Sequence, residues 1–91
     1  MTDGDRQYAV EIEPVAWNVL MTMPDRIQEQ ILTAIEGLES QPRPQNAKRL
    51  TGKWRGFYRI RSGNYRVIYT IENERLVVVV IKIGDQRDVY E

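Results

Sequence analysis

Residues 57–69 read F-Y-R-I-R-S-G-N-Y-R-V-I-Y. Apolar and polar side chains alternate on either side of the short S-G-N stretch, which is the pattern of two strands joined by a turn. The Gly-Asn pair at 63–64 is typical of a two-residue hairpin turn. This register places Arg61 directly opposite Arg66, with Arg59 two residues away on the same face. The alternative is a three-residue turn, which would send Arg66 to the other face.

Three arginines on one sheet face are costly, because like charges that face each other across a sheet are destabilising. An anionic ligand would remove this conflict, so the cluster Arg59, Arg61 and Arg66 is predicted to bind phosphate. Guanidinium groups also stabilise the extra negative charge of a pentavalent phosphorus transition state. RNA carries its own nucleophile, the ribose 2′-hydroxyl, so such a site needs alignment, charge stabilisation and help with protons. Tyrosine or a guanidinium with a perturbed pKa would have to move the protons.

Outward from the hairpin, periodicity predicts the remaining elements. The expected strands cover residues 7–13, 54–61, 65–71 and 76–83, and the last of these is apolar on both faces. A short helix begins at Pro14 and ends before Pro24, with Val15, Ala16, Val19 and Leu20 on its buried face. A second helix runs from Pro24 to near Ser40, with Ile27, Ile31, Ala34, Ile35 and Leu38 as its apolar stripe. The order β-α-α-β-β-β predicts an α+β fold, a helical hairpin packed on a small, mainly antiparallel sheet.

Length and composition agree with one domain covering residues 1–91, since 42% of the residues are hydrophobic and no repeat is visible. The chain contains no Cys and no His, which excludes disulfides, thiolate sites and the usual neutral-pH general base. We expect no metal and no cofactor. No apolar run reaches the roughly 18–20 residues of a membrane span, and the N-terminus is acidic and polar, unlike a signal peptide. A cytoplasmic protein is expected, without a membrane partner.

The charges are unevenly distributed along a chain whose net charge is zero. Residues 41–69 contain no Asp or Glu but hold eight of the 13 basic residues. Such a block is the footprint expected for a polyanion, although a solvated charged surface is the plain alternative. Beyond the three central arginines, the block contains the expected RNA-backbone contacts Arg43, Lys48, Arg49, Lys53 and Arg55.

Several motifs, taken together and in order, resemble the RelE/ParE toxin superfamily. They are the helical hairpin, the loop P-R-P-Q-N-A-K-R-L-T-G, the strand pair Y-R-I-R and Y-R-V-I-Y, the apolar strand, and the ending G-D-Q-R-D-V-Y. The resemblance implies a cytoplasmic toxin that a cognate antitoxin neutralises. RelE-type members bind the ribosomal A site and cut mRNA there. By this resemblance the catalytic residues are Arg59, Arg61, Arg66, Arg87 and Tyr90.

Two features depart from that pattern. Many relatives carry a His-Arg pair after the tail glycine, where this chain has Asp85 and Gln86. Ribosome-dependent members are often strongly basic, whereas this chain has a pI of about 6.3. Three functions therefore stay open at this point: a ribosome-dependent endoribonuclease, a ParE-like inhibitor of DNA gyrase, and a toxin-like module that only binds its antitoxin or RNA.

Overall fold

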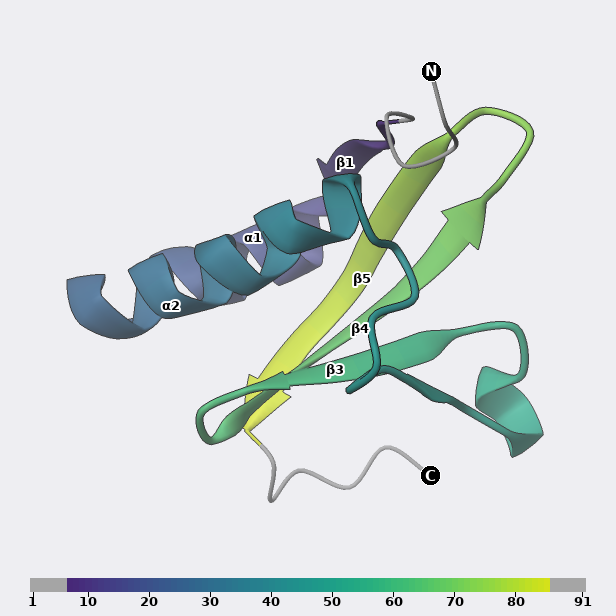
Figure 1. Cartoon of the computed structure of the whole chain (residues 1–91). Coiled ribbons are helices and arrows are strands. Elements are labelled where there is room, and N and C mark those ends of the chain that lie inside the picture. Colours follow the sequence, from purple (N-terminus) through teal and green to yellow (C-terminus); the bar gives the residue numbers. More distant parts are fainter. Residues whose placement is uncertain (1–6, 86–91) are drawn as a thin grey trace.

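The computed structural model describes residues 7–85, in which two helices cover one face of a five-stranded sheet (Figure 1). In chain order the elements are β1 (Ala9–Ile12), α1 (Pro14–Met21), α2 (Asp25–Glu36), the 3-10 helix η2 (Gly37–Glu39), β2 (Lys48–Arg49), the 3-10 helix η3 (Gly52–Trp54), β3 (Tyr58–Ser62), β4 (Tyr65–Glu72) and β5 (Val77–Asp85). The strand order across the sheet is β1-β5-β4-β3-β2. Only the pair of β1 and β5 is parallel among these strands. The predicted α+β fold is confirmed, with β2 as an additional short strand.

Both helices form where the sequence predicts them. Proline occupies the first position of α1, and Asp25 lies in the first turn of α2, where its charge favours the positive end of the helix dipole. The prediction for Val15 is wrong, because its side chain is 71% exposed while Ala16 and Leu20 are buried. Apolar residues flank the buried face of α1 on both sides, so the pattern alone did not show which flank faces water. Among residues 7–85, no helix is long and apolar enough to span a membrane.

The core lies between the helices and the near face of the sheet. Its central members are Leu20, Ile31, Ile35 and Leu38 from the helical layer and Ile60, Val67, Tyr69, Val78, Val80 and Ile83 from the strands. All four valines from Val77 to Val80 are buried. β5 lies between β1 and β4, and side chains on both of its faces are buried, in agreement with its continuous apolar run.

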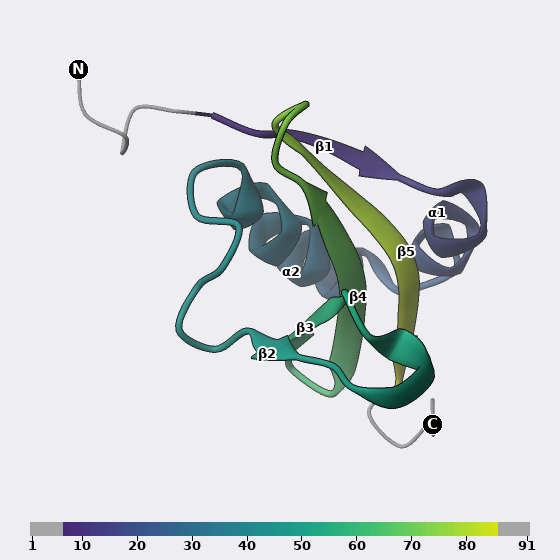
Figure 2. The ribbon, with the colours of Figure 1, turned by 90° about the vertical axis from the view of Figure 1, so that its right-hand side faces the viewer.

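The strand predicted over residues 54–61 begins later than expected, at Tyr58. The segment before it forms η3, with Gly52 at φ 65° and Gly56 at φ 94°. These positive φ values bend the chain out of the extended conformation, so Trp54 does not share a strand face with Tyr58. In Figures 1 and 2 this segment projects from the sheet on the side away from the helices.

Candidate nucleic-acid interface

The β3–β4 hairpin has the register expected from its Gly-Asn turn. Arg61 pairs with Arg66, and Arg59 pairs with Ile68. Gly63 has φ 59°, which suits the first central position of a type II′ turn. The two-residue turn is therefore confirmed, and the three-residue alternative does not occur.

The three arginines of the hairpin share the sheet face that points away from the helices. Ile60 and Val67 are paired with each other and belong to the core beneath the helices. Side chains alternate along a strand, so Arg59, Arg61 and Arg66 lie on the opposite face. Arg61 is exposed, whereas only 5% of Arg59 is exposed. The register thus places the three arginines next to one another on one face of the hairpin.

Two lysines extend this charged surface along the sheet. Lys48 of β2 pairs with Arg59, and Lys82 of β5 pairs with Ile68. The cationic face therefore comprises Lys48, Arg59, Arg61, Arg66 and Lys82, spread over four neighbouring strands. Sequence reasoning missed Lys82. The available signal was a single lysine that interrupts an otherwise apolar strand.

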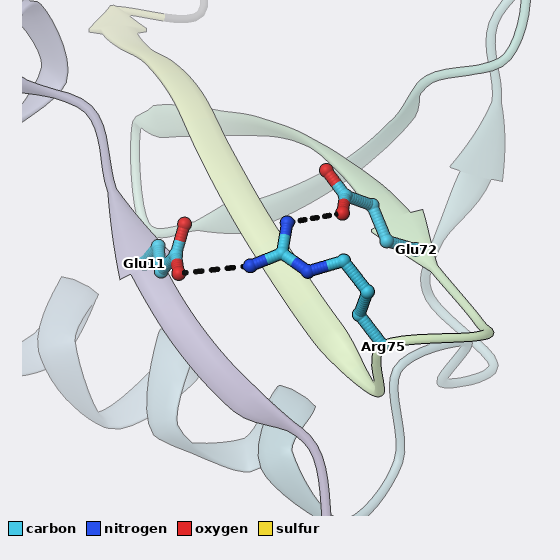
Figure 3. Close-up of polar contacts among 3 residues, drawn as sticks. All are labelled: Glu11, Glu72 and Arg75. Carbon is cyan, nitrogen blue, oxygen red and sulfur yellow. Dashed lines mark hydrogen bonds and ion pairs between the residues drawn. The ribbon is translucent and has the colours of Figure 1, made fainter.

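Carboxylates occupy the other end of the same sheet face. Arg75 bridges two of them, with Nη1 at 2.6 Å from Glu72 Oε1 and Nη2 at 3.8 Å from Glu11 Oε2 (Figure 3). All three side chains are well exposed, so this network adds little to stability, about 0–1 kcal/mol for each pair. The bridge joins a carboxylate of β1 to one at the end of β4, and both lie away from the arginines of the hairpin.

Arg43 is separated from the cationic face. Its Nε donates a hydrogen bond to the Tyr58 hydroxyl at 3.0 Å, and its guanidinium lies 5.5 Å from the centre of the Tyr58 ring. Its Nη2 donates to Asn73 Oδ1 at 3.5 Å. Tyr58 in turn stacks on the buried Tyr69, on the helix side of the sheet. Arg43 thus ties its loop to β3 and to the β4–β5 turn.

The other predicted RNA contacts lie in the segment from β2 to β3. Arg49 and Arg55 line one hollow of this segment, and Lys53 is exposed in η3. Thr70 Oγ1 donates to the Gly56 carbonyl at 3.2 Å, which holds the segment against β4. Arg87 and Tyr90, predicted from the family resemblance, lie outside the described residues. Within residues 7–85, no group of three or more acidic, His or Cys side chains is arranged to hold a metal ion.

The fold agrees with that of a known family of small toxins. The chain belongs to the RelE/ParE superfamily, because residues 12–90 match the family described as ParE toxin of type II toxin–antitoxin system, parDE. It is similar to the toxin RelG of Mycobacterium tuberculosis, with 28% identity over 83 residues that cover 91% of this chain and 95% of that protein.

Two solved structures extend this similarity to the whole fold. The toxin–antitoxin complex RelBE2 of Mycobacterium tuberculosis contains a chain with a TM-score of 0.81 and 27% identity, covering 92% of this chain and 97% of that one. The archaeal RelE–RelB complex of Pyrococcus horikoshii gives a TM-score of 0.79 and 27% identity, covering 91% and 99%. The first was solved as a toxin–antitoxin complex and the second as a complex of RelE with RelB.

Proposed function

We propose that this toxin is a ribosome-dependent endoribonuclease that cuts mRNA in the ribosomal A site without a metal ion. The observation that carries the proposal is the pairing of Arg61 with Arg66, with Arg59 on the same sheet face. A face with this arrangement is suited to a dianionic phosphorane, which needs several cations at one location. The similarity to RelE-type toxins favours mRNA as the substrate.

In the proposed reaction the ribose 2′-oxygen attacks the adjacent phosphorus, and the bond from phosphorus to the 5′-oxygen breaks. The 2′-hydroxyl loses a proton, and the leaving 5′-oxygen gains one. The guanidinium groups of Arg61 and Arg66 bind the nonbridging oxygens and stabilise the charge that develops there. Arg59 supplies further positive charge from the adjoining position of β3. The tail residues Arg87 and Tyr90 are proposed to complete the site, with Tyr90 stacking on a base or assisting proton transfer.

The proposed partners follow from the same resemblance. A cognate antitoxin would neutralise the toxin, as the complexes of both solved relatives suggest. The ribosome and its bound message would be the target, which places the activity in the cytoplasm. Lys48, Arg49, Lys53 and Arg55 are proposed to contact the RNA backbone.

The test is induction of the protein in cells, followed by primer extension on translated messages. The wild-type protein should produce cuts within codons, and the Arg61→Ala plus Arg66→Ala double variant should produce none while retaining its fold. Arg26→Ala is the matched control, because Arg26 is an exposed arginine of α2 on the helical side. This control should cut like the wild type.

The other outcomes separate the alternatives. Double-strand DNA breaks with an SOS response and intact messages would identify a gyrase inhibitor. Normal growth, with neither breaks nor cuts, would identify a module that only binds. Full toxicity of a folded Arg61→Ala plus Arg66→Ala variant would refute the assignment of the site.

A further inference from the structure

The segment between β2 and β3 encloses a hollow that the proposed cleavage site does not use. Its volume is about 540 Å³, within the roughly 300–1,000 Å³ of small-molecule sites. The lining consists of Arg49, Leu50, Thr51, Gly52, Arg55, Gly56, Phe57 and Tyr58. These eight residues come from one continuous stretch of chain that turns back on itself through η3.

The hollow is held open by hydrogen bonds within the segment. Leu50 N donates to the Phe57 carbonyl at 2.9 Å and closes its base, and Arg55 N donates to the Gly52 carbonyl at 3.1 Å. The rings of Trp54 and Phe57 meet edge to face, with centroids 5.6 Å apart. Thr70 of β4 also donates to the Gly56 carbonyl, which attaches the segment to the sheet.

The chemistry of the lining selects an anion that also carries a flat ring. Arg49 and Arg55 are the charged members of the lining, and Thr51 adds a hydroxyl. The backbone at Gly52 and Gly56 is bare, since a Cβ added at either position would meet nothing within 4 Å. A phosphate can therefore approach the main chain closely, between two guanidinium forks. Phe57 supplies an aromatic surface against which a base can pack.

The hollow adjoins the cationic face. Arg49 pairs with Tyr58 and therefore points to the opposite sheet face from the next pair, Lys48 and Arg59. The later part of the segment lies on the side of the cationic face, because the Gly56 carbonyl accepts a hydrogen bond from Thr70. Thr70 follows Arg66 and Ile68 along one face of β4, so this end of the hollow adjoins the arginine cluster.

We propose that this hollow binds one nucleotide of single-stranded RNA next to the scissile phosphate, with its phosphate between Arg49 and Arg55 and its base against Phe57. The inference rests on the proposed ribonuclease function for the identity of the strand, but binding at the hollow can be measured without cleavage.

The experiment uses Trp54 as an internal probe, because it contacts Phe57 at the rim of the hollow. The Trp17→Phe background removes the second tryptophan, which lies in α1. Titration with uridine trinucleotide at low salt should change the Trp54 fluorescence and saturate. Arg49→Ala plus Arg55→Ala should weaken binding about tenfold or more. Arg26→Ala plus Arg75→Ala removes the same charge elsewhere and should bind like the background protein.

A second comparison tests the base contact. A trinucleotide without bases should bind more weakly than uridine trinucleotide, and Phe57→Leu should remove that difference. Equal affinity of the Arg49→Ala plus Arg55→Ala variant and its charge-matched control would overturn the proposal. Equal affinity of the two oligonucleotides, or no fluorescence change with either, would also overturn it.

The two proposals fail separately. Suppose that binding of the trinucleotide requires Arg49 and Arg55 but the wild-type protein never cuts messages on ribosomes. This result would support nucleotide binding at the hollow and refute the proposed nuclease function. If messages are cut but the Arg49→Ala plus Arg55→Ala variant binds the trinucleotide like its control, the nuclease function is supported and nucleotide binding at the hollow is refuted. The Arg61→Ala plus Arg66→Ala variant should lose cleavage and keep the Trp54 response.

Discussion

Leu76, at the turn between β4 and β5, has φ 55°, in the left-handed region that bulky side chains rarely adopt. Its N–H donates to the Asn73 carbonyl at 3.3 Å, so the turn fixes this conformation. Asn tolerates the left-handed region, whereas a β-branched residue does not. We predict that Leu76→Val unfolds more easily than Leu76→Asn, by about 1–2 kcal/mol. Urea denaturation of the two variants measures the difference, and equal midpoints would show that the turn relaxes.

Tyr69 gives the fold a dependence on alkaline pH. Burial, assisted by the neighbouring Tyr58, raises the pKa of Tyr69 from 10.0 to about 12, against a smaller opposing effect of Arg43. Below pH 10 the folded and unfolded chains both hold the proton, and the full stabilisation is present. Between pH 10 and about 12 only the folded state holds it, so the contribution of Tyr69 to stability is lost as pH rises.

The Tyr69→Phe variant isolates this effect. Its free energy of unfolding should be lower by about 1 kcal/mol at neutral pH, because the Pro42 carbonyl loses the hydroxyl that donates to it; in the wild type that hydrogen bond is 2.7 Å long. Above pH 10, where the phenol of the unfolded chain begins to ionise, the difference from the wild type should shrink. Urea titrations of both proteins across the alkaline range test the sign, and a difference that grows with pH would contradict it.

At the scale of elements, the arginines that the proposed function requires in the β3–β4 hairpin are unfavourable for its stability. Arg61 and Arg66 face each other directly, and opposite charges at such positions are favourable by roughly 0.2–1 kcal/mol. Arg61→Glu should therefore raise the free energy of unfolding by about 0.5–1 kcal/mol and abolish message cleavage. Thermal denaturation and primer extension on one preparation check both halves. A less stable Arg61→Glu variant would show that repulsion between the arginines is already relieved within the chain.

Elements with a clear local pattern could be predicted from the sequence. The Gly63-Asn64 turn and the alternation around it determined the arginine register, and the prolines marked the starts of both helices. The two-residue strand β2 could not be predicted, because its basic residues have no periodicity. The bend at Gly52 and Gly56 could not be predicted, because the neighbouring aromatic residues Trp54 and Phe57 favour a strand.

Residues of the candidate site could be predicted only where neighbours in the sequence are also neighbours in space. Arg59, Arg61 and Arg66 belong to one hairpin, so local register was enough to bring them together. Lys82 joins them from β5 through pairing with Ile68, which only the strand order reveals. Arg43 lies in the same basic stretch of sequence, yet its contacts with Tyr58 and Asn73 place it apart from the cluster.

At the scale of the whole molecule, zero net charge conceals a separation of charge on one sheet face. The residues of the cationic face lie at one end of this sheet surface, and the Glu11–Arg75–Glu72 bridge lies at the other end. Affinity for single-stranded RNA falls as the salt concentration rises. Each lost phosphate contact should reduce the magnitude of this negative slope, log affinity against log salt, by about 0.7. The Arg61→Ala plus Arg66→Ala variant should show this flattening, and Arg26→Ala should not. Affinity measured over a range of salt concentrations tests it, and parallel slopes would speak against phosphate contacts at these arginines.

The parallel pairing of β1 with β5 has a consequence for synthesis of the toxin. Ala9 pairs with Val77, so the first strand made finds its partner only when the last strand has left the ribosome. Until then β1 has no neighbour, and the valines of β5 are missing from the core. Until β5 has emerged, a growing polypeptide therefore lacks Lys82 of the cationic face and part of the core beneath that face. Under the proposed nuclease function, an unfinished chain would therefore lack the complete site needed to cut the message that encodes it.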